Sequence, residues 1–145
     1  MKLLIVFLFI SLNSFASEQA KELMGHKKFK AIALSKSVKD INNQILVLLK
    51  KNLPKKYKKD ATLIQKTIIA NAKKYNLDPL FVTAIIAGES SFNPEAVGPV
   101  EEIGLMQLRP HVAKWICKDY LRKKYTPKML TNPYDNIRIG TRYLA

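Results

Sequence analysis

The residues best suited to chemistry begin at Glu89, which follows the almost wholly apolar run LFVTAIIAG at 80–88. On a helix, Glu89 would share a face with Ile85 and Ile86. Apolar neighbours disfavour a charged carboxylate, and the negative end of the helix dipole adds about 0.3–1 kcal/mol in the same direction. We therefore expect a raised pKa for Glu89, as a general acid requires. The same pattern also fits an ordinary glutamate at a helix end.

The other reactive side chains form no second motif. Cys117 is the only cysteine, so no disulfide can form within the chain, and its helical spacing favours a small core residue over a nucleophile. His26 and His111 lie far apart in the sequence, and we expect both at the surface. These residue types give no spacing typical of a metal site.

Helices must position these side chains, because apolar residues recur at three- and four-residue steps and almost no segment alternates with period two. We therefore predict an all-α fold. Prolines, asparagines and capping aspartates mark where the segments begin and end. The predicted helices cover 38–49, the segment from Asp60 to Asn76, the segment from Asp78-Pro79 to about Ser90, the segment from Pro110 to Thr126, and the segment from Asn132-Pro133 onward.

The stretch ESSFNPEAVGPVEEIGLMQLRP at 89–110 closely resembles the signature of the soluble lytic transglycosylase (SLT) catalytic domain. That family belongs to the goose-lysozyme-like branch of the lysozyme superfamily. Its pattern reads Glu-Ser-x-Phe-x-Pro-x-Ala and then Gly-Leu-Met-Gln-Leu-x-Pro, and every position fits without a gap. The segments at 70–90 and 132–144 resemble the flanks of the family's signature. The resemblance covers about residues 60–145 and implies a lysozyme-like helical domain.

The resemblance implies a substrate and a reaction. The substrate is the glycan of peptidoglycan, in which N-acetylglucosamine and N-acetylmuramic acid (GlcNAc and MurNAc) alternate. Glu89 aligns with the family's single catalytic glutamate, which protonates the glycosidic oxygen. It then acts as a base on the C6 hydroxyl of MurNAc, which closes as a 1,6-anhydro ring. The resemblance implies no metal and no organic cofactor.

Further site residues follow from the same alignment. Met106 and Gln107 are expected to line the glycan cleft, with Gln107 as a hydrogen-bonding group. Ser90 is expected either to support the carboxylate and bind substrate or to cap the end of the helix. Phe92 and Tyr143 are expected to be packing residues.

The chain departs from the family pattern at three positions. Gly98 stands where the family usually has Ser, Glu101 where it usually has Gly, and Arg109 where an apolar residue such as Met is common. A goose-lysozyme type of hydrolase would need a further acid to position water. The candidates for this acid are Glu95, Glu101 and Glu102.

The family normally continues beyond the position of 140–144 with several helices that close the cleft. We therefore expect a C-terminally short domain, and two explanations stay open: a fragment or interrupted reading frame, or a protein partner that completes the cleft. A truncated peptidoglycan-binding protein with weak or no activity is the alternative function.

The first residues have the layout of a secretory signal. Lys2 precedes the apolar run LLIVFLFI at 3–10, and small residues at Ser14 and Ala16 suit a cleavage site. The apolar run is too short to span a bilayer, which takes about 20 residues. We predict a signal peptide at 1–16, export to the bacterial periplasm or cell wall, and no stable membrane insertion after cleavage.

The distribution of charged residues along the chain indicates the rest of the domain organisation. The chain holds 25 Lys and Arg against 11 Asp and Glu, a formal net charge of +14. Lysines concentrate in a lead-in at 17–59, which precedes the expected catalytic domain at 60–145. They serve either as an attachment region or as ordinary solvated helix faces. Nucleic-acid binding is not expected, because the chain has no zinc-ligand spacing, no phosphate loop and no aromatic–basic interleaving.

Overall fold

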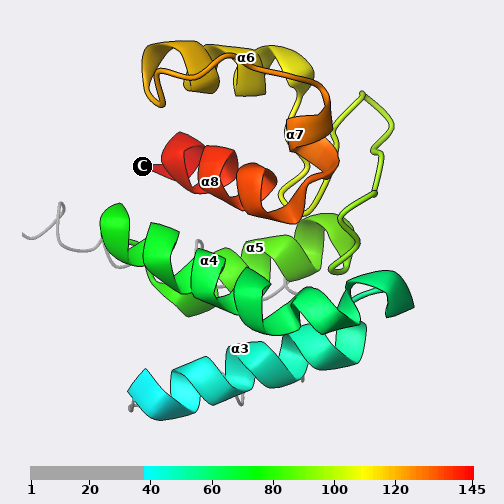
Figure 1. Ribbon diagram of the computed structural model, residues 1–145, viewed down its shortest axis with the longest axis vertical. Coiled ribbons are helices and arrows are strands. Elements are labelled where there is room, and N and C mark those ends of the chain that lie inside the picture. Colours follow the sequence, from blue (N-terminus) through cyan, green and yellow to red (C-terminus); the bar gives the residue numbers. More distant parts are fainter. Residues whose placement is uncertain (1–37) are drawn as a thin grey trace, which may run out of the picture. The chain divides into compact units, whose positions relative to one another are not determined.

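The computed structural model describes residues 38–145, and the predicted signal peptide lies outside these described residues. The described chain is built of helices and contains no β-strand (Figure 1), which confirms the predicted all-α fold. The helices are α3 (Val38–Asn52), η1 (Lys55–Asp60), α4 (Ala61–Lys74), α5 (Pro79–Ser90), α6 (Pro110–Asp119), α7 (Lys128–Thr131) and α8 (Pro133–Leu144). None of them is both long and apolar enough to cross a bilayer.

Side-chain caps start two of the helices where the sequence predicted a start. The Asp78 carboxylate accepts a hydrogen bond from Leu80 N at 2.7 Å, and the Asn132 side chain accepts from Tyr134 N and Asp135 N. Each cap precedes a proline at the first helical position, where no N–H is needed. Asp60 makes no side-chain cap, because η1 runs directly into α4 and leaves Asp60 in a helical conformation.

Two short helices were not predicted, namely η1 and α7. Both lie where the sequence indicated only a break, and each directly follows a proline, Pro54 and Pro127 respectively. Proline interrupts one helix, but its fixed φ also suits the start of the next. Segments of four to six residues are too short to show an apolar periodicity.

Helix α4 lies at the centre of the described unit. It packs against α3, α5 and α8, and α8 in turn lies between α4 and α6 (Figure 1). The lysine-rich helix α3 contributes Ile45 and Leu49 to the core, and Leu53 directly after the helix packs there too, each at most 2% exposed. The lead-in helix is therefore part of the same compact packing as the helices that follow it.

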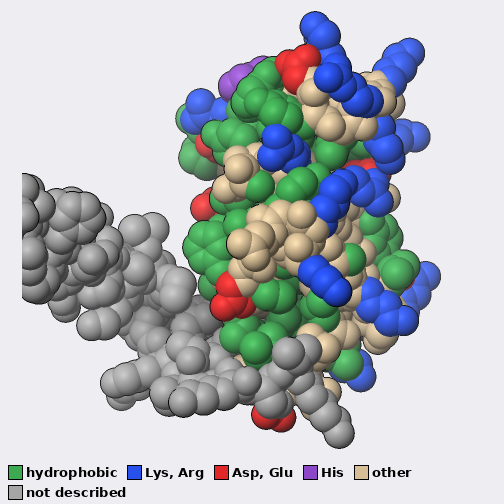
Figure 2. Space-filling view, turned by 90° about the vertical axis from the view of Figure 1, so that its left-hand side faces the viewer, with side chains coloured by type: hydrophobic (Ala, Val, Ile, Leu, Met, Phe, Trp, Pro, Cys, Tyr) green, Lys and Arg blue, Asp and Glu red, His purple; other side chains and the backbone are tan. Residues whose placement is uncertain are grey.

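The lysines from the last turn of α3 to the end of η1 are solvated. All six between the end of α3 and Asp60 are exposed: Lys50, Lys51, Lys55, Lys56, Lys58 and Lys59. Figure 2 shows lysine and arginine side chains along the right-hand edge of one face. The ammonium group of Lys56 pairs with Glu95, and this bond holds the pKa of Glu95 below its usual range. Glu95 is therefore engaged in an ion pair at the protein surface.

Candidate active site

The signature segment forms a long loop at 91–109 that joins α5 to α6. Two isolated antiparallel bridges, Val97 to Ile103 and Ile103 to Leu108, fold the loop back on itself. Gly104 has a φ of +85°, and a Cβ there would collide with the Leu130 carbonyl and the Asn136 amide. The glycine is required by both its backbone angle and its surroundings.

Asn136 attaches this loop to α8. Its side chain is fully buried and makes three hydrogen bonds: it accepts from Met106 N at 2.8 Å and donates to the carbonyls of Ile103 and Leu130, both at 2.9 Å. A primary amide offers the donors and the acceptor that this set of main-chain groups needs. The sequence showed Asn136 only as part of a matching segment and did not indicate this role.

Ser90 on α5 and Gly140 on α8 also hold the strip of the loop around Leu105 and Met106. The Ser90 hydroxyl is buried and lies 3.0 Å from the carbonyl of Ile86 and 2.9 Å from that of Leu105, so it links the end of α5 to the loop. Gly140 on α8 leaves room for Met106, whose sulfur lies within clashing distance of the place that a Cβ would take. Ser90 does not line the pocket described below, so substrate contact by Ser90 stays a prediction, and its bonds favour a positioning role.

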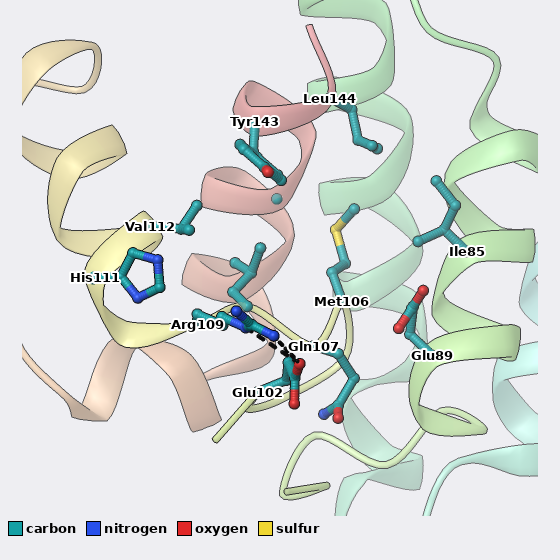
Figure 3. Close-up of a pocket in the computed structure, with 12 residues that line it drawn as sticks. Ile85, Glu89, Glu102, Met106, Gln107, Arg109, His111, Val112, Tyr143 and Leu144 are labelled. Atoms are coloured by element: carbon teal, nitrogen blue, oxygen red, sulfur yellow. Dashed lines mark hydrogen bonds and ion pairs between the residues drawn. The ribbon is translucent and has the colours of Figure 1, made fainter. Parts of the chain in front are cut away.

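A pocket of about 460 Å³ opens above this strip (Figure 3). It is lined by Ile85, Glu89, Glu102, Met106, Gln107, Leu108, Arg109, His111, Val112, Gly140, Tyr143 and Leu144. Glu89 projects from α5 on one side toward Met106, and His111 and Val112 project from α6 on the other. The structure thus brings three of the four predicted site residues, Glu89, Met106 and Gln107, into one cavity.

Glu89 lies in the last turn of α5, as predicted, but its apolar neighbours do not shield it from solvent as that prediction required. Val82 and Ile86 are fully buried and point into the core, whereas Ile85 and Glu89 occupy the neighbouring face, which is the wall of the pocket. Ile85 is half-buried and Glu89 is exposed. No hydrogen bond or ion pair from the described residues reaches the Glu89 carboxylate, so it is free to meet a ligand in the pocket.

Gln107 is held at the base of the pocket by two hydrogen bonds. Its amide nitrogen donates to the carbonyls of Ala96 at 3.1 Å and Gly104 at 3.0 Å. Its backbone adopts a φ of +43°, which non-glycine residues rarely do. The side-chain carbonyl receives no hydrogen bond from the described residues, so it is available as an acceptor for a sugar hydroxyl or amide.

Residues 66–145 match the family model described as the transglycosylase SLT domain. The chain belongs to this family. The match includes every residue that lines the pocket, together with α5, the signature loop and α8. The resemblance seen in the sequence is thereby confirmed, and the pocket of this SLT domain is a candidate active site.

The three departures from the family pattern have different consequences in this SLT domain. A Cβ on Gly98 would lie 2.7 Å from both Gln107 Oε1 and Glu102 Oε2, so those two side chains occupy the space that a serine would need. Glu101 is exposed and does not line the pocket. Arg109 does line it, and pairs there with Glu102.

Of the three candidates for a second acid, only Glu102 lies in the pocket. Its Oε1 accepts from the Arg109 guanidinium and its Oε2 from Val100 N. Hydrogen bonds from its own main-chain N–H, from Val100 N–H and from Arg109 lower the pKa of Glu102, so it stays ionised at neutral pH. An ionised Glu102 gives the pocket a second carboxylate besides Glu89.

The two aromatic residues expected to be packing residues differ. Phe92 is 4% exposed and belongs to the core, as predicted. Tyr143 is 53% exposed and lines the pocket, so the packing role predicted for it is wrong. Tyr143 lies three residues after Gly140, which places both on the pocket face of α8. That spacing identifies Tyr143 only once Gly140 is known to line the pocket, which the sequence did not show.

Proposed function

We propose that this SLT-family chain is a peptidoglycan lytic transglycosylase that cleaves the bond between MurNAc and GlcNAc, with Glu89 as the catalytic residue. The observation that carries the proposal is the exposed carboxylate of Glu89, which has no partner among residues 38–145, on the wall of a pocket whose base presents Met106 and Gln107. An acid that must reach a glycosidic oxygen needs this accessibility. We further propose that residues 1–16 direct export, because the substrate lies outside the cytoplasm.

The proposed reaction uses Glu89 twice. In its protonated form, Glu89 gives its proton to the oxygen that leaves with GlcNAc, and the bond from this oxygen to C1 of MurNAc breaks. The neighbouring acetamido group relieves the positive charge that develops at C1. The Glu89 carboxylate then removes the proton from the C6 hydroxyl, whose oxygen bonds to C1. The product is 1,6-anhydro-MurNAc, Glu89 is protonated again, and no water is consumed.

Digestion of purified peptidoglycan followed by mass spectrometry tests this reaction. Wild-type protein should release fragments with 1,6-anhydro-MurNAc ends, and Glu89→Gln should reduce release by at least about a hundredfold, the contribution typical of a general acid. Glu101→Gln is the matched control, because it removes a carboxylate from the adjoining loop, outside the pocket. Release should be unchanged in that variant.

The products also separate the alternatives. Ordinary reducing ends in place of anhydro ends would identify a hydrolase and point to Glu102 as the residue that positions water. Equal glycan binding by wild type and Glu89→Gln, with no release by either, would identify a binding protein without turnover. Either outcome would contradict the transglycosylase proposal.

A further inference from the structure

Arg109 places a positive charge in a pocket that otherwise presents carboxylates. It is the last residue before α6, in an extended conformation with φ −71° and ψ 140°, and its guanidinium lines the pocket on the side away from Glu89 (Figure 3). Its side chain is 48% exposed. A family member with Met at this position would have no charge there.

The Arg109 guanidinium makes only some of the hydrogen bonds that it could make. Its Nε and one terminal nitrogen both donate to the same oxygen of Glu102, each at 3.3 Å, which is longer than a typical charge-assisted bond. The other terminal nitrogen has no hydrogen-bond partner among the described residues. Arginine binds a carboxylate best through two parallel bonds to two oxygens, and Glu102 does not provide that geometry.

Glu102 does not depend on Arg109 for its position. Its other oxygen accepts from Val100 N at 3.1 Å, and Gly98 leaves the space in which this oxygen lies. The carboxylate would therefore stay in place if the guanidinium turned toward another partner. The pair is an exchangeable contact at the pocket surface.

Peptidoglycan supplies a suitable partner, because its muramic acid units carry peptides with free carboxylates, whereas the lactyl carboxylate of such a unit is used up in the amide bond to its peptide. We propose that Arg109 binds a carboxylate of this peptide substituent, so that the enzyme favours peptide-bearing strands, and that Glu102 is the internal carboxylate which the substrate displaces. This inference rests on the proposed function for the substrate class, but it concerns binding and needs no turnover.

The test measures the binding of soluble glycan strands in a Glu89→Gln background, so that no cleavage is required. Two forms of the same strands are used, one with native carboxylates and one with carboxylates amidated by carbodiimide and methylamine. The parent should bind native strands about three- to fivefold more tightly than amidated strands, the range of a half-exposed ion pair. Arg109→Gln should bind both forms alike, and Arg109→Lys should recover part of the preference.

Glu102→Gln separates this role from a structural one. If Glu102 competes with the substrate, its neutralisation should leave binding of native strands unchanged or tighter, whereas Arg109→Gln weakens it. If the pair only stabilises the loop, both variants should weaken binding of native and amidated strands equally and lower the melting temperature together. Lys114→Gln, an exposed position on α6 outside the pocket, controls for the loss of one positive charge.

Two results would overturn the inference. One is a parent protein that binds native and amidated strands equally. The other is an Arg109→Gln variant that keeps the full preference for native strands. The proposed reaction could still hold in both cases, because anhydro products from wild-type protein are assayed separately. Conversely, a carboxylate preference in the absence of anhydro products would support Arg109 and refute the transglycosylase.

Discussion

Replacing Asn136 with alanine should destabilise the protein and disable the pocket together. The buried amide is the only side chain of α8 that bonds directly to the signature loop in the part of the chain that the structure describes. Alanine removes both donors and the acceptor, and it leaves the N–H of Met106 and the carbonyls of Ile103 and Leu130 without this partner. The loop strip that forms the base of the pocket would lose its attachment to the helix beneath it.

The three lost hydrogen bonds set the size of the expected destabilisation. A buried polar group that loses its partner costs about 1–3 kcal/mol, and three groups are affected. The lower value for each predicts a loss of about 3 kcal/mol in the free energy of unfolding. With a urea dependence of about 1–2 kcal/mol per molar for a domain of this size, the unfolding midpoint should fall by roughly 2 M.

Urea unfolding followed by circular dichroism measures this loss, with Thr141→Val as the matched control. Thr141 is a fully buried polar residue on the same helix, but its hydroxyl donates only to carbonyls within α8, Ile137 at 2.7 Å and Arg138 at 3.2 Å. The control should therefore cost less than about 1 kcal/mol. An Asn136→Ala variant that unfolds within about 1 kcal/mol of wild type would refute the reasoning.

Asn136→Asp adds a pH signature to the same prediction. The introduced carboxyl group keeps the acceptor for Met106 N but faces the two carbonyl oxygens that Asn136 now donates to. Burial and these oxygens favour the protonated form, so its pKa in the folded state should lie above the unfolded value of about 3.9. The variant should be most stable, relative to wild type, below that unfolded value and lose stability as pH rises through the folded pKa. A constant difference from pH 4 to 8 would contradict this.

Two further predictions concern single residues. Gly98→Ser restores the residue usual in the family, but its Cβ would meet Gln107 Oε1 and Glu102 Oε2, so glycan binding should weaken. A double-mutant cycle with Glu102→Ala should show that most of this loss depends on Glu102. Additive changes in the free energy of binding would count against this. Cys117 is fully buried and its thiol pKa is raised by desolvation, so Ellman's reagent should react at least about a hundredfold more slowly with native than with unfolded protein. Comparable rates at pH 8 would show that Cys117 is accessible.

The helices were predictable because their signals are local. The Asp78 and Asn132 caps, each followed by a proline, marked the starts of α5 and α8, and apolar spacing marked the buried faces. The signature loop could be assigned by its resemblance to a family, but its geometry could not be derived. It depends on left-handed backbone angles at residues such as Gln107 and on a partner, Asn136, 30 residues beyond Met106. Contacts of that range leave no periodic trace in a sequence.

The prediction for Glu89 shows where the local argument fails. Helical spacing correctly placed Glu89 beside Ile85, but spacing does not say that the Ile86 face is core while the Ile85 face is the wall of a cavity. The distinction is made by α8, α6 and the loop, which approach the Ile85 face without filling it. The Glu89 carboxylate is therefore accessible because these elements, distant in sequence, do not pack against it. Asn136 and Gly140, which set how closely α8 and the loop approach, determine the pocket as much as the residues that line it.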